Sequence, residues 1–521
     1  MKKIISISIC LLSLTFNLSS QITFQKTFEK DGGGNGFACL QTSDEGYIIG
    51  GYTATFGSSD AYLIKTDVNG DTSWTKTFGG SGADAGWSID QTSDGGYIIA
   101  GYSNSFGAGN DDVYLIKTDM NGDTVWTKTY GGTNNERGNY IKQTSDGGYI
   151  ITGYTESFGA GGQDLYVIKL GATGDSLWIK TFGGTMNDVG NSIIQTADGG
   201  YIVTGVSYSF GAGNGDVYLV KLDVNGDSLW TKAYGGTSLD YGYSVQQTSS
   251  GSYIVAGYTE SFGAGNYDCY VFKIDVNGDT LWTKTYGGTS VDQGRDIQET
   301  SDNGFIVTGW TFSFGAGGAD VFVIRTDTNG DTLWTKTIGG PLDDQARSVR
   351  ETADDGYILT GGSASFGSSY NVYLIKIDGT NYVGCNQSSP TTIVGATLTQ
   401  TSNTTTQLEN TITSVASTGT IAASGAELMT VCESAGINSE KNVNFLSVFP
   451  NPSVGVFIVL FTSTIKNGQI EIINLLGENV YSENILNVSS ASINIEGISP
   501  GIYFVRFSDG DQFYCTKIIL E

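Results

Sequence analysis

Short apolar runs alternate with clusters of glycine, asparagine and aspartate along most of the chain. Around residues 87–130, four such runs are separated by a Ser-Asp-Gly-Gly turn at 93–96, a glycine-rich loop at 105–109 and the pair Asn121-Gly122. Runs of this length between turn residues predict β-strands. An Asn-Gly pair between two strands predicts a hairpin, since both residues tolerate positive φ. The pattern therefore predicts units of four antiparallel strands.

The four-stranded unit repeats at a fixed interval. Six tryptophans lie 52 residues apart, each in nearly the same local sequence: Trp74, Trp126, Trp178, Trp230, Trp282 and Trp334. A four-stranded unit at this spacing is typical of a β-propeller, whose sheets are stable only when they stack on their neighbours. A fixed position within a sheet usually means packing, so we expect these tryptophans in the core rather than as a row of stacking platforms.

The two ends of the repeat region predict how the ring closes. The first three strands occur seven times, up to Asp378, but the tryptophan strand occurs six times. Residues 24–28 match residues 74–78 and supply the missing copy. The N-terminal strand should therefore complete the sheet that begins at Asp344 and leave no open edge between first and last sheets. For residues 21–378 we predict a seven-bladed β-propeller in an all-β protein.

The N-terminus has the features of a secretory signal. Lys2 and Lys3 precede an apolar run that ends near Phe16, and small polar residues follow. This pattern predicts a signal peptide at residues 1–20. No other stretch is apolar for long enough to span a membrane, so we expect an exported chain with no transmembrane segment.

The C-terminal segment carries a set of short motifs in a characteristic order. They include a Pro-Asn-Pro triplet and glycines in later turns, and the residues are Pro450, Asn451, Pro452, Gly455, Gly477, Gly501, Tyr503 and Lys517. With these motifs, residues 442–521 resemble the C-terminal sorting domain of type IX secretion in Bacteroidetes. Glu478 and Ile498 depart from the family pattern. Residues 21–378 resemble bacterial secreted propellers with Asp-Gly-Gly-Tyr-Ile repeats, whose function is mostly unassigned.

The sorting-domain resemblance implies several properties. The fold would be a small Ig-like β-sandwich, and the partner would be the type IX secretion machinery. The protein would be secreted or held at the outer-membrane surface. The sorting domain would be removed or exchanged for a surface anchor. Alternating apolar and polar residues between glycine-rich turns are compatible with such a sandwich.

Residues 379–441 connect these two regions and are rich in serine, threonine and alanine. Cys385 and Cys432 bracket a stretch with little apolar content, and an exported location permits disulfides. We therefore predict a disulfide between them. The remaining cysteines of the exported chain, Cys39, Cys269 and Cys515, fall within predicted strands and should be free thiols.

Composition narrows the function. The chain has 53 acidic and 26 basic residues, a formal net charge of −27 and no histidine. Such an acidic chain is a poor partner for nucleic acid, whose affinity depends on basic surfaces. The lack of histidine excludes a Ser-His-Asp triad and histidine metal ligands. The sequence assigns no catalytic residue.

Two acidic sets recur on the predicted face that carries the long loops. The first opens each first strand: Asp84, Glu136, Asp188, Asp240, Asp292 and Asp344. The second follows the glycine-rich loops: Asp60, Asp112, Asp164, Asp216, Asp268 and Asp320. If the first strand is innermost, the first set would surround a channel mouth and suit a cation such as Ca²⁺, which takes oxygen ligands. Alternatively, each acid caps a turn by accepting backbone N–H bonds. No cofactor is predicted, and the metal state stays open.

One position of the first strand differs from repeat to repeat. In chain order it holds Phe37, Trp87, Asn139, Asn191, Tyr243, Arg295 and Arg347. Aromatic side chains and arginines are enriched at recognition surfaces. Ligand contacts are therefore expected here first, with Trp87, Tyr243, Arg295 and Arg347 as the main candidates.

Two functions remain open. The first is an exported binding or adhesion protein that takes a glycan or protein ligand on a propeller scaffold. The second is a carbohydrate-active hydrolase or lyase that uses carboxylates on the loop face. A glycosidase needs two carboxylates in different environments, whereas the recurring acids are nearly equivalent. This equivalence favours binding over catalysis.

Overall fold

The computed structural model describes residues 21–379 apart from 30–31 and 55–57, seven short stretches between 386 and 433, and residues 446–520 apart from 450–455, 475–478, 496–500 and 509–512. Every regular element in these residues is a β-strand, which confirms the all-β prediction. The predicted signal peptide (1–20), Cys385 and the motif residues Pro450, Asn451, Pro452, Gly455 and Gly477 lie outside the described residues. The chain forms two compact units, Met1–Gly436 and Ile437–Glu521.

The described residues of the first unit form seven antiparallel sheets, which we number in chain order. Each takes four strands from the repeat region, as predicted, and their bounds follow. Sheet 1 contains β2 (Gly34–Gln41), β3 (Tyr47–Thr53), β4 (Asp60–Thr66) and β5 (Thr72–Gly79). Sheet 2 contains β6 (Asp84–Gln91), β7 (Tyr97–Ser103), β8 (Asp112–Thr118) and β9 (Thr124–Tyr130). Sheet 3 contains β10 (Glu136–Gln143), β11 (Tyr149–Thr155), β12 (Asp164–Leu170) and β13 (Ser176–Gly183).

The remaining four sheets repeat this order. Sheet 4 contains β14 (Asp188–Gln195), β15 (Tyr201–Ser207), β16 (Asp216–Leu222) and β17 (Ser228–Tyr234). Sheet 5 contains β18 (Asp240–Gln247), β19 (Tyr253–Thr259), β20 (Asp268–Ile274) and β21 (Thr280–Gly287). Sheet 6 contains β22 (Asp292–Glu299), β23 (Phe305–Thr311), β24 (Asp320–Thr326) and β25 (Thr332–Ile338). Sheet 7 contains β26 (Asp344–Glu351), β27 (Tyr357–Ser363), β28 (Asn371–Ile377) and the N-terminal strand β1 (Phe24–Glu29).

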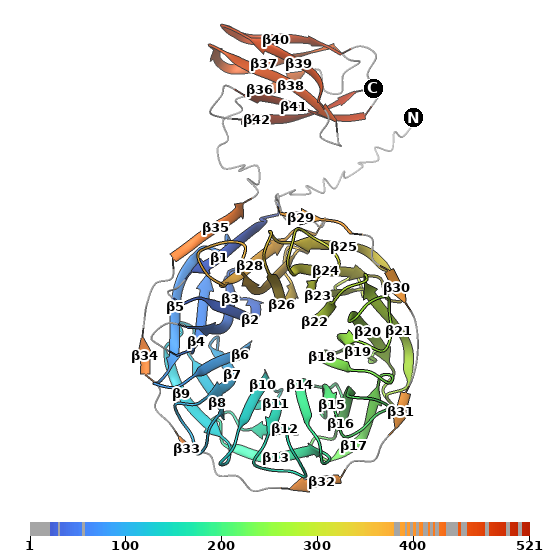
Figure 1. The fold of residues 1–521 in the computed structure, drawn as a ribbon. Coiled ribbons are helices and arrows are strands. Elements are labelled where there is room, and N and C mark those ends of the chain that lie inside the picture. The colour runs from blue at the N-terminus through green and yellow to red at the C-terminus, as the bar shows by residue number, and fades with distance from the viewer. Residues whose placement is uncertain are drawn as a thin grey trace, which may run out of the picture. The chain divides into compact units, whose positions relative to one another are not determined.

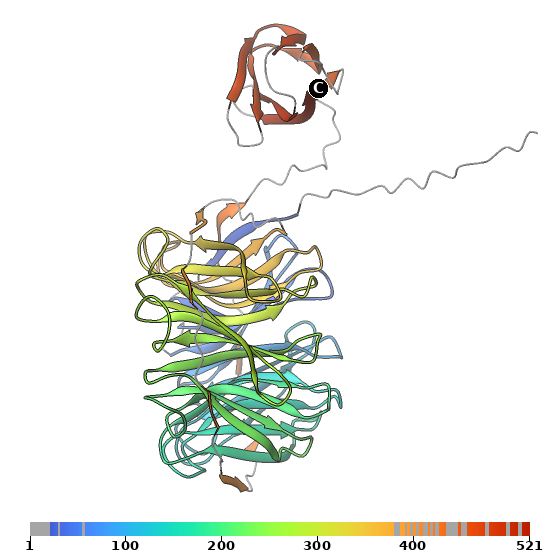
Figure 2. The same cartoon turned by 90° about the vertical axis from the view of Figure 1, so that its right-hand side faces the viewer.

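The seven sheets follow one another around a ring, with the first strand of each nearest the centre (Figure 1). Strand β1 pairs with β28 in antiparallel register, from Phe24 opposite Lys376 to Phe28 opposite Val372. Strand β2 of sheet 1 contacts β6 of sheet 2 and also β26 and β27 of sheet 7. Seen from the side, the strands cross the thickness of the ring and the loops project from its two rims (Figure 2).

Apolar side chains fill the spaces between neighbouring sheets. Between sheets 1 and 2, for example, Leu63 and Phe78 pack with Ile99 and Tyr114, and all four are buried. Both faces of the second and third strands are buried, so these strands read as continuous apolar runs rather than as an alternation. The recurring tryptophans lie partly buried at the same interfaces, where Trp74 packs 6.3 Å from the ring of Tyr97. They pack as predicted.

The hairpin between the third and fourth strands is more elaborate than the Asn-Gly pair predicted. Gly70 has a φ of 77°, but Asn69 is not among the residues with positive φ. Instead, the carboxylate of Asp67 accepts the backbone N–H groups of Asn69 at 2.9 Å and Asp71 at 2.8 Å. The expectation that both residues of the pair use positive φ is therefore wrong. An aspartate two residues earlier stabilises the turn through its side chain.

The segment that follows sheet 7 adds a fifth strand to the outer edge of every sheet. The strands, together called the belt, are β29 (Gln387–Ser388), β30 (Ile393–Gly395), β31 (Gln400–Ser402), β32 (Thr406–Glu409), β33 (Val415–Ala416), β34 (Thr420–Ala422) and β35 (Glu427–Glu433). They pair in this order with β25, β21, β17, β13, β9, β5 and β1, and so pass once around the outside of the ring (Figure 1). The sequence analysis predicts only a connecting segment here.

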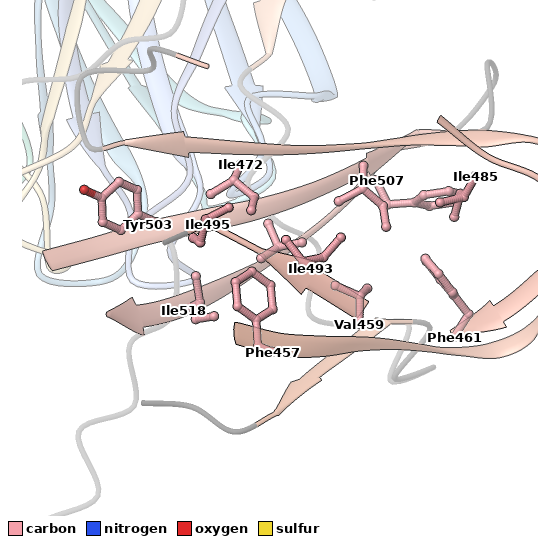
Figure 3. Close-up of a cluster of buried hydrophobic side chains, with 12 residues drawn as sticks. Phe457, Val459, Phe461, Ile472, Ile485, Ile493, Ile495, Tyr503, Phe507 and Ile518 are labelled. Atoms are coloured by element: carbon pink, nitrogen blue, oxygen red, sulfur yellow. The ribbon is translucent and has the colours of Figure 1, made fainter. Parts of the chain in front are cut away.

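In the second unit, the residues that the structure describes form two antiparallel sheets. One has the order β36 (Leu446–Phe449), β37 (Val456–Ile465) and β40 (Val488–Asn494). The other has the order β39 (Asn479–Ile485), β38 (Gly468–Asn474), β41 (Gly501–Ser508) and β42 (Phe513–Leu520). Phe457, Val459 and Phe461 of β37 point toward Ile472 of β38 and Phe507 of β41 and form a buried core between the sheets (Figure 3).

Candidate ligand-binding cavity

The first strand of every sheet contains a β-bulge at the same place. In sheet 2, Gly86 pairs with Gly101 and Ser88 pairs with Ala100, so Trp87 has no partner between them. The same register shift occurs in the other six sheets. The unpaired residue is in turn Phe37, Trp87, Asn139, Asn191, Tyr243, Arg295 and Arg347. A bulge re-aims one side chain and is common beside binding sites. The varying position selected from the sequence is therefore the bulged position.

Each repeat has a glycine on the second strand opposite the bulge, and the close approach of the two strands explains why. A β-carbon on Gly101 would overlap the carbonyl oxygen and carbon of Ala85. Gly153 meets the carbonyl of Arg137 in the same way in sheet 3. The second strand can approach the bulged strand this closely only without a side chain. The glycine of each Tyr-Ile-Ile-x-Gly motif thus holds the bulge in place.

All seven bulged side chains line one cavity of about 400 Å³. The first strands surround the centre of the ring, which brings residues from all seven repeats to one place (Figure 1). The volume lies within the range of small-molecule sites, about 300–1,000 Å³. The structure therefore brings together Trp87, Tyr243, Arg295 and Arg347, which the sequence analysis selects as the main candidates.

Two arginines form the basic side of the cavity. The guanidinium carbon of Arg295 lies 3.8 Å from the ring centroid of Tyr243 and 4.1 Å from that of Trp310. The guanidinium carbon of Arg347 lies 4.6 Å from the ring of Phe37 and 5.5 Å from that of Trp310. Burial, and next the charge of Arg295, lower the pKa of Arg347 to about 10. Trp310 is a second-strand residue that the sequence analysis does not single out.

Aromatic and amide side chains form other parts of the wall. Trp87 packs against Phe37 and Tyr102, with centroids 6.2 Å and 5.1 Å away. The amide Nδ2 of Asn139 donates to the carbonyl of Gly190 at 2.8 Å, which fixes the orientation of that side chain. The buried Oδ1 of Asn139 has no hydrogen-bond donor.

The amide of Asn191 is held in the same way as that of Asn139, because its Nδ2 donates to the carbonyl of Gly242 at 2.8 Å. Each asparagine thus bonds to the bulge of the next sheet. Packing contacts and hydrogen bonds therefore fix the orientation of the side chains in the cavity wall.

A second cavity of about 690 Å³ adjoins the first and shares Tyr140 and Arg350 with it. Arg350 forms an ion pair with Asp296, which is the one carboxylate among the residues lining the first cavity. None of these three residues is a candidate from the sequence alone. They lie on first strands one to three residues beyond the bulge, where their types vary without an obvious pattern.

The six predicted first-strand acids lie elsewhere. Asp84, Glu136, Asp188, Asp240, Asp292 and Asp344 are fully buried, and none is among the residues lining either cavity. Asp84 is typical, because it accepts the backbone N–H of Gly80 at 2.8 Å and the hydroxyl of Ser105 at 2.6 Å. These bonds tie the connection between two sheets to the following long loop. They match the alternative in which each acid caps a turn, and a direct role in ligand binding stays a prediction.

The second acidic set lies beside the first. Asp216 accepts the backbone N–H groups of Ala212 at 2.9 Å and Gly213 at 3.2 Å, and a side chain on Gly235 would overlap both Asp216 and Asp240. Burial raises the pKa of Asp164, Asp216 and Asp320 to about 6, and the neighbouring first-strand acid adds to the effect. Six of the seven interfaces between sheets thus enclose a pair of carboxylates separated by one glycine, and the interface between sheets 7 and 1 has Asn371 and Asn35 instead.

Metal and membrane features can be stated for the described residues. They contain no group of three or more acidic or cysteine side chains placed to hold a metal ion. Calcium binding stays a prediction. No membrane-crossing helix is present in the described part of the chain. Cys39 and Cys269 are buried free thiols, as predicted. The disulfide between Cys385 and Cys432 stays a prediction, because Cys385 lies outside the described residues.

Comparison with known proteins assigns the C-terminal unit. Residues 447–521 match the secretion system C-terminal sorting domain. This match confirms the resemblance to the type IX sorting domain and implies an origin in Bacteroidetes. The protein is exported and is secreted or located at the outer-membrane surface. The domain implies an interaction with the type IX secretion system.

The repeat region has more distant relatives. The chain is 25% identical over 349 residues to the regulatory protein FlaEY of Caulobacter vibrioides, a match that spans 56% of this chain and 36% of that protein. Sqt1 from Chaetomium thermophilum matches 64% of this chain and 82% of its own, at 13% identity and a TM-score of 0.38. An endo-1,5-alpha-L-arabinanase from Thermotoga petrophila matches 65% of this chain and 82% of its own, at 14% identity and a TM-score of 0.23. These similarities are too distant to bear on function.

Proposed function

We propose that this protein is an exported binding or adhesion protein that holds a glycan or protein ligand in the central cavity of a seven-bladed β-propeller. In this proposal the propeller begins at residue 21 and is closed by β1, and the belt surrounds it. Residues 442–521 form a small Ig-like sandwich that directs secretion. The signal peptide is residues 1–20.

The observation that carries this proposal is the convergence of the varying residues. The seven repeats are nearly identical in their turns and core, yet the bulged position holds five different residue types. Those seven side chains line a single cavity. Structural positions in a repeat protein recur, whereas contacts to a ligand need not. Aromatic and arginine side chains at such positions are typical of recognition sites.

The carboxylates support binding over hydrolysis. A glycosidase needs two carboxylates that flank one bond. Asp188 and Asp240 are fully buried and bonded to loop groups, and Asp296 is the one carboxylate among the residues lining the first cavity. Because Asp296 pairs with Arg350, its charge is already compensated. The hydrolase or lyase alternative would need a second acid that the lining residues do not supply.

A glycan and protein-ligand array with the exported protein tests the proposal. We expect a ligand whose affinity falls about tenfold or more in Trp87→Ala and Tyr243→Ala, the loss typical of an aromatic contact residue. Val125→Ala, an exposed hairpin residue, is the matched control and should bind normally. Unchanged affinity in both cavity variants would exclude the cavity as the site. Cleavage of the ligand during the assay would favour the enzymatic alternative.

A further inference from the structure

We propose that the ligand of the central cavity is an acidic saccharide, whose carboxylate or sulfate group binds Arg295 and Arg347 while a sugar ring packs on the aromatic wall. This inference rests on the proposed function and specifies the chemistry of its ligand. It follows from charge compensation in the cavity and from the side chains that surround the two arginines.

Arg295 and Arg347 differ from every other arginine of the chain. The four others form ion pairs with a carboxylate: Arg137 with Asp111, Arg325 with Asp302, Arg350 with Asp296 and Arg506 with Glu471. Among the described residues, neither Arg295 nor Arg347 has a carboxylate partner. The polar contacts of Arg295 are to neutral groups, the amide of Gln293 at 3.0 Å and the hydroxyl of Tyr243. The Nε atoms of both arginines are buried and have no acceptor.

Two uncompensated positive charges are unexpected in this protein. The chain has twice as many acidic as basic residues, 53 against 26, so carboxylates are available at almost every surface. Both arginines are half-buried, and a partly desolvated charge without a partner is costly, the more so beside a like charge. Arg347 is also desolvated enough that its pKa falls. The site is therefore built to receive a negative charge from outside the chain.

The aromatic rings fix the two guanidinium groups without neutralising them. Tyr243 and Trp310 lie against Arg295, and Phe37 lies against Arg347. Such cation–π contacts orient a guanidinium plane but leave its outer N–H groups free for a carboxylate or sulfate. An arginine fork recognises these planar or tetrahedral anions better than a lysine does.

The rest of the wall selects a sugar over a simple anion. Trp87 and Phe37 provide aromatic faces, which suit the apolar faces of a sugar ring, and the asparagine amides can exchange hydrogen bonds with hydroxyl groups. The buried Oδ1 of Asn139 lacks a donor, and a ligand hydroxyl is the group that would supply one. Anion, apolar ring face and hydroxyl occur together in uronate and sulfated sugars.

Calorimetry on the full exported chain tests this inference. The ligands are tri-galacturonate, its neutral methyl ester and a sulfated disaccharide. We expect at least one acidic sugar to bind, and to bind tenfold or more tightly than the ester. Arg295→Gln and Arg347→Gln should each weaken that binding tenfold or more, and raising the salt concentration should weaken it in the wild type. Lys128→Gln is the control, because it removes an equal charge from the ion pair with Asp175 in a hairpin. It should change the affinity for the acidic sugar less than twofold.

Thermal unfolding gives a second readout that needs no saccharide. Since each arginine is uncompensated, Arg347→Gln should unfold at a higher temperature than the wild type. Sodium sulfate should stabilise the wild type more than a variant that carries both Arg295→Gln and Arg347→Gln. Equal affinity for acid and ester, or normal binding by both arginine variants, would overturn the inference. If the acid and the ester bind equally and Trp87→Ala abolishes binding of the ester as well, the ligand still binds in the central cavity. In that case only the inference of an anionic ligand fails. The carboxylate and sulfate arms identify which anion is preferred.

Discussion

The backbone N–H of Ala353 donates a hydrogen bond to Oε1 of Gln41 at 2.8 Å, across 312 residues of chain. The same bond joins other neighbouring sheets, from Ser93 to Gln143 at 2.8 Å and from Ala197 to Gln247 at 2.8 Å. In each case the last residue of a first strand accepts from the turn of the preceding sheet. The junction of sheets 7 and 1 is therefore bonded like the junctions within the chain.

Removal of the Gln41 acceptor should weaken this junction. Gln41→Leu leaves the N–H of Ala353 to water, so we expect a loss of about 1 kcal/mol in the free energy of unfolding. Gln41→Glu is the matched control, because Glu299 and Glu351 accept the equivalent bond in sheets 6 and 7. Urea titration measures both. Equal losses in the two variants would show that the acceptor is not what matters.

The hairpin between β12 and β13 of sheet 3 can be stabilised by a residue that the equivalent hairpins of other sheets contain. Gly171 occupies the position at which Asp67 and Asp223 accept two backbone N–H bonds. Gly171→Asp should supply these bonds and raise the unfolding free energy by about 1 kcal/mol. Asp223→Gly should lower it by a similar amount. A destabilised Gly171→Asp protein would contradict this account of the turn.

The glycines opposite the bulges should tolerate no side chain. Gly101→Ala places a methyl group on the carbonyl of Ala85, so we expect a loss of about 3 kcal/mol or more. Gly171→Ala is the control, since the nearest atoms to its added carbon are 3.9 Å away, and its stability should stay within about 1 kcal/mol of wild type. Chemical denaturation decides between them. A mild Gly101→Ala phenotype would mean that the bulge can shift.

Stability should depend on pH in two opposite ways. Burial raises the pKa of Asp164, Asp216 and Asp320 to about 6. Below that pH the folded chain therefore holds protons that the unfolded chain, with a pKa near 3.8, releases. These groups stabilise the fold increasingly as pH falls from above 6 toward 4.

A different set of carboxylates opposes this trend at lower pH. Burial tends to raise the pKa of Asp94 and Asp146, but hydrogen bonds from a threonine and a lysine prevail and lower it to about 2. Their stabilisation is present above pH 3.8 and is lost as pH falls toward 2. The melting temperature measured from pH 8 to pH 2 should thus rise and then fall. Asp216→Asn should flatten the rise, and an unchanged profile would contradict the assignment.

The belt should protect the outer edges of the sheets. A chain that ends at residue 378 would leave seven edge strands unpaired, and open edges promote association between copies. We expect this truncated chain to self-associate more than one that ends at Gly436, the boundary of the first unit. Light scattering at matched concentrations measures the difference. Equal scattering would show that the belt does not shield the edges.

Most of the ring could be predicted from sequence because its strands must bury both faces. The apolar runs around Tyr97 and Val113 predict closely where their strands begin and end. The repeat then indicates which strands share a sheet. The varying position at Trp87 identified the cavity wall, because a repeat isolates the residues that do not need to recur.

The belt could not be predicted in the same way. Its strands are as short as two residues, Val415–Ala416 for example, and they pair through backbone groups with an edge that already exists. Such pairing requires no apolar periodicity, so serine and threonine suffice. The bulges were hidden for a related reason, because an extra residue such as Trp87 changes the register without changing the local composition. The acids open the first and third strands, as the sequence indicates, but their burial, which decides their role, depends on the neighbouring sheet.

Strand β1 lies between β28 and β35, so both of its neighbours come from the far end of the first unit. Because β1 is the first strand in the chain, it can pair on both sides only when the residues up to 433 are also available. Contacts between residues so distant along the chain form late. The ring therefore stays open, and the chain can still be threaded, until almost all of the first unit is available.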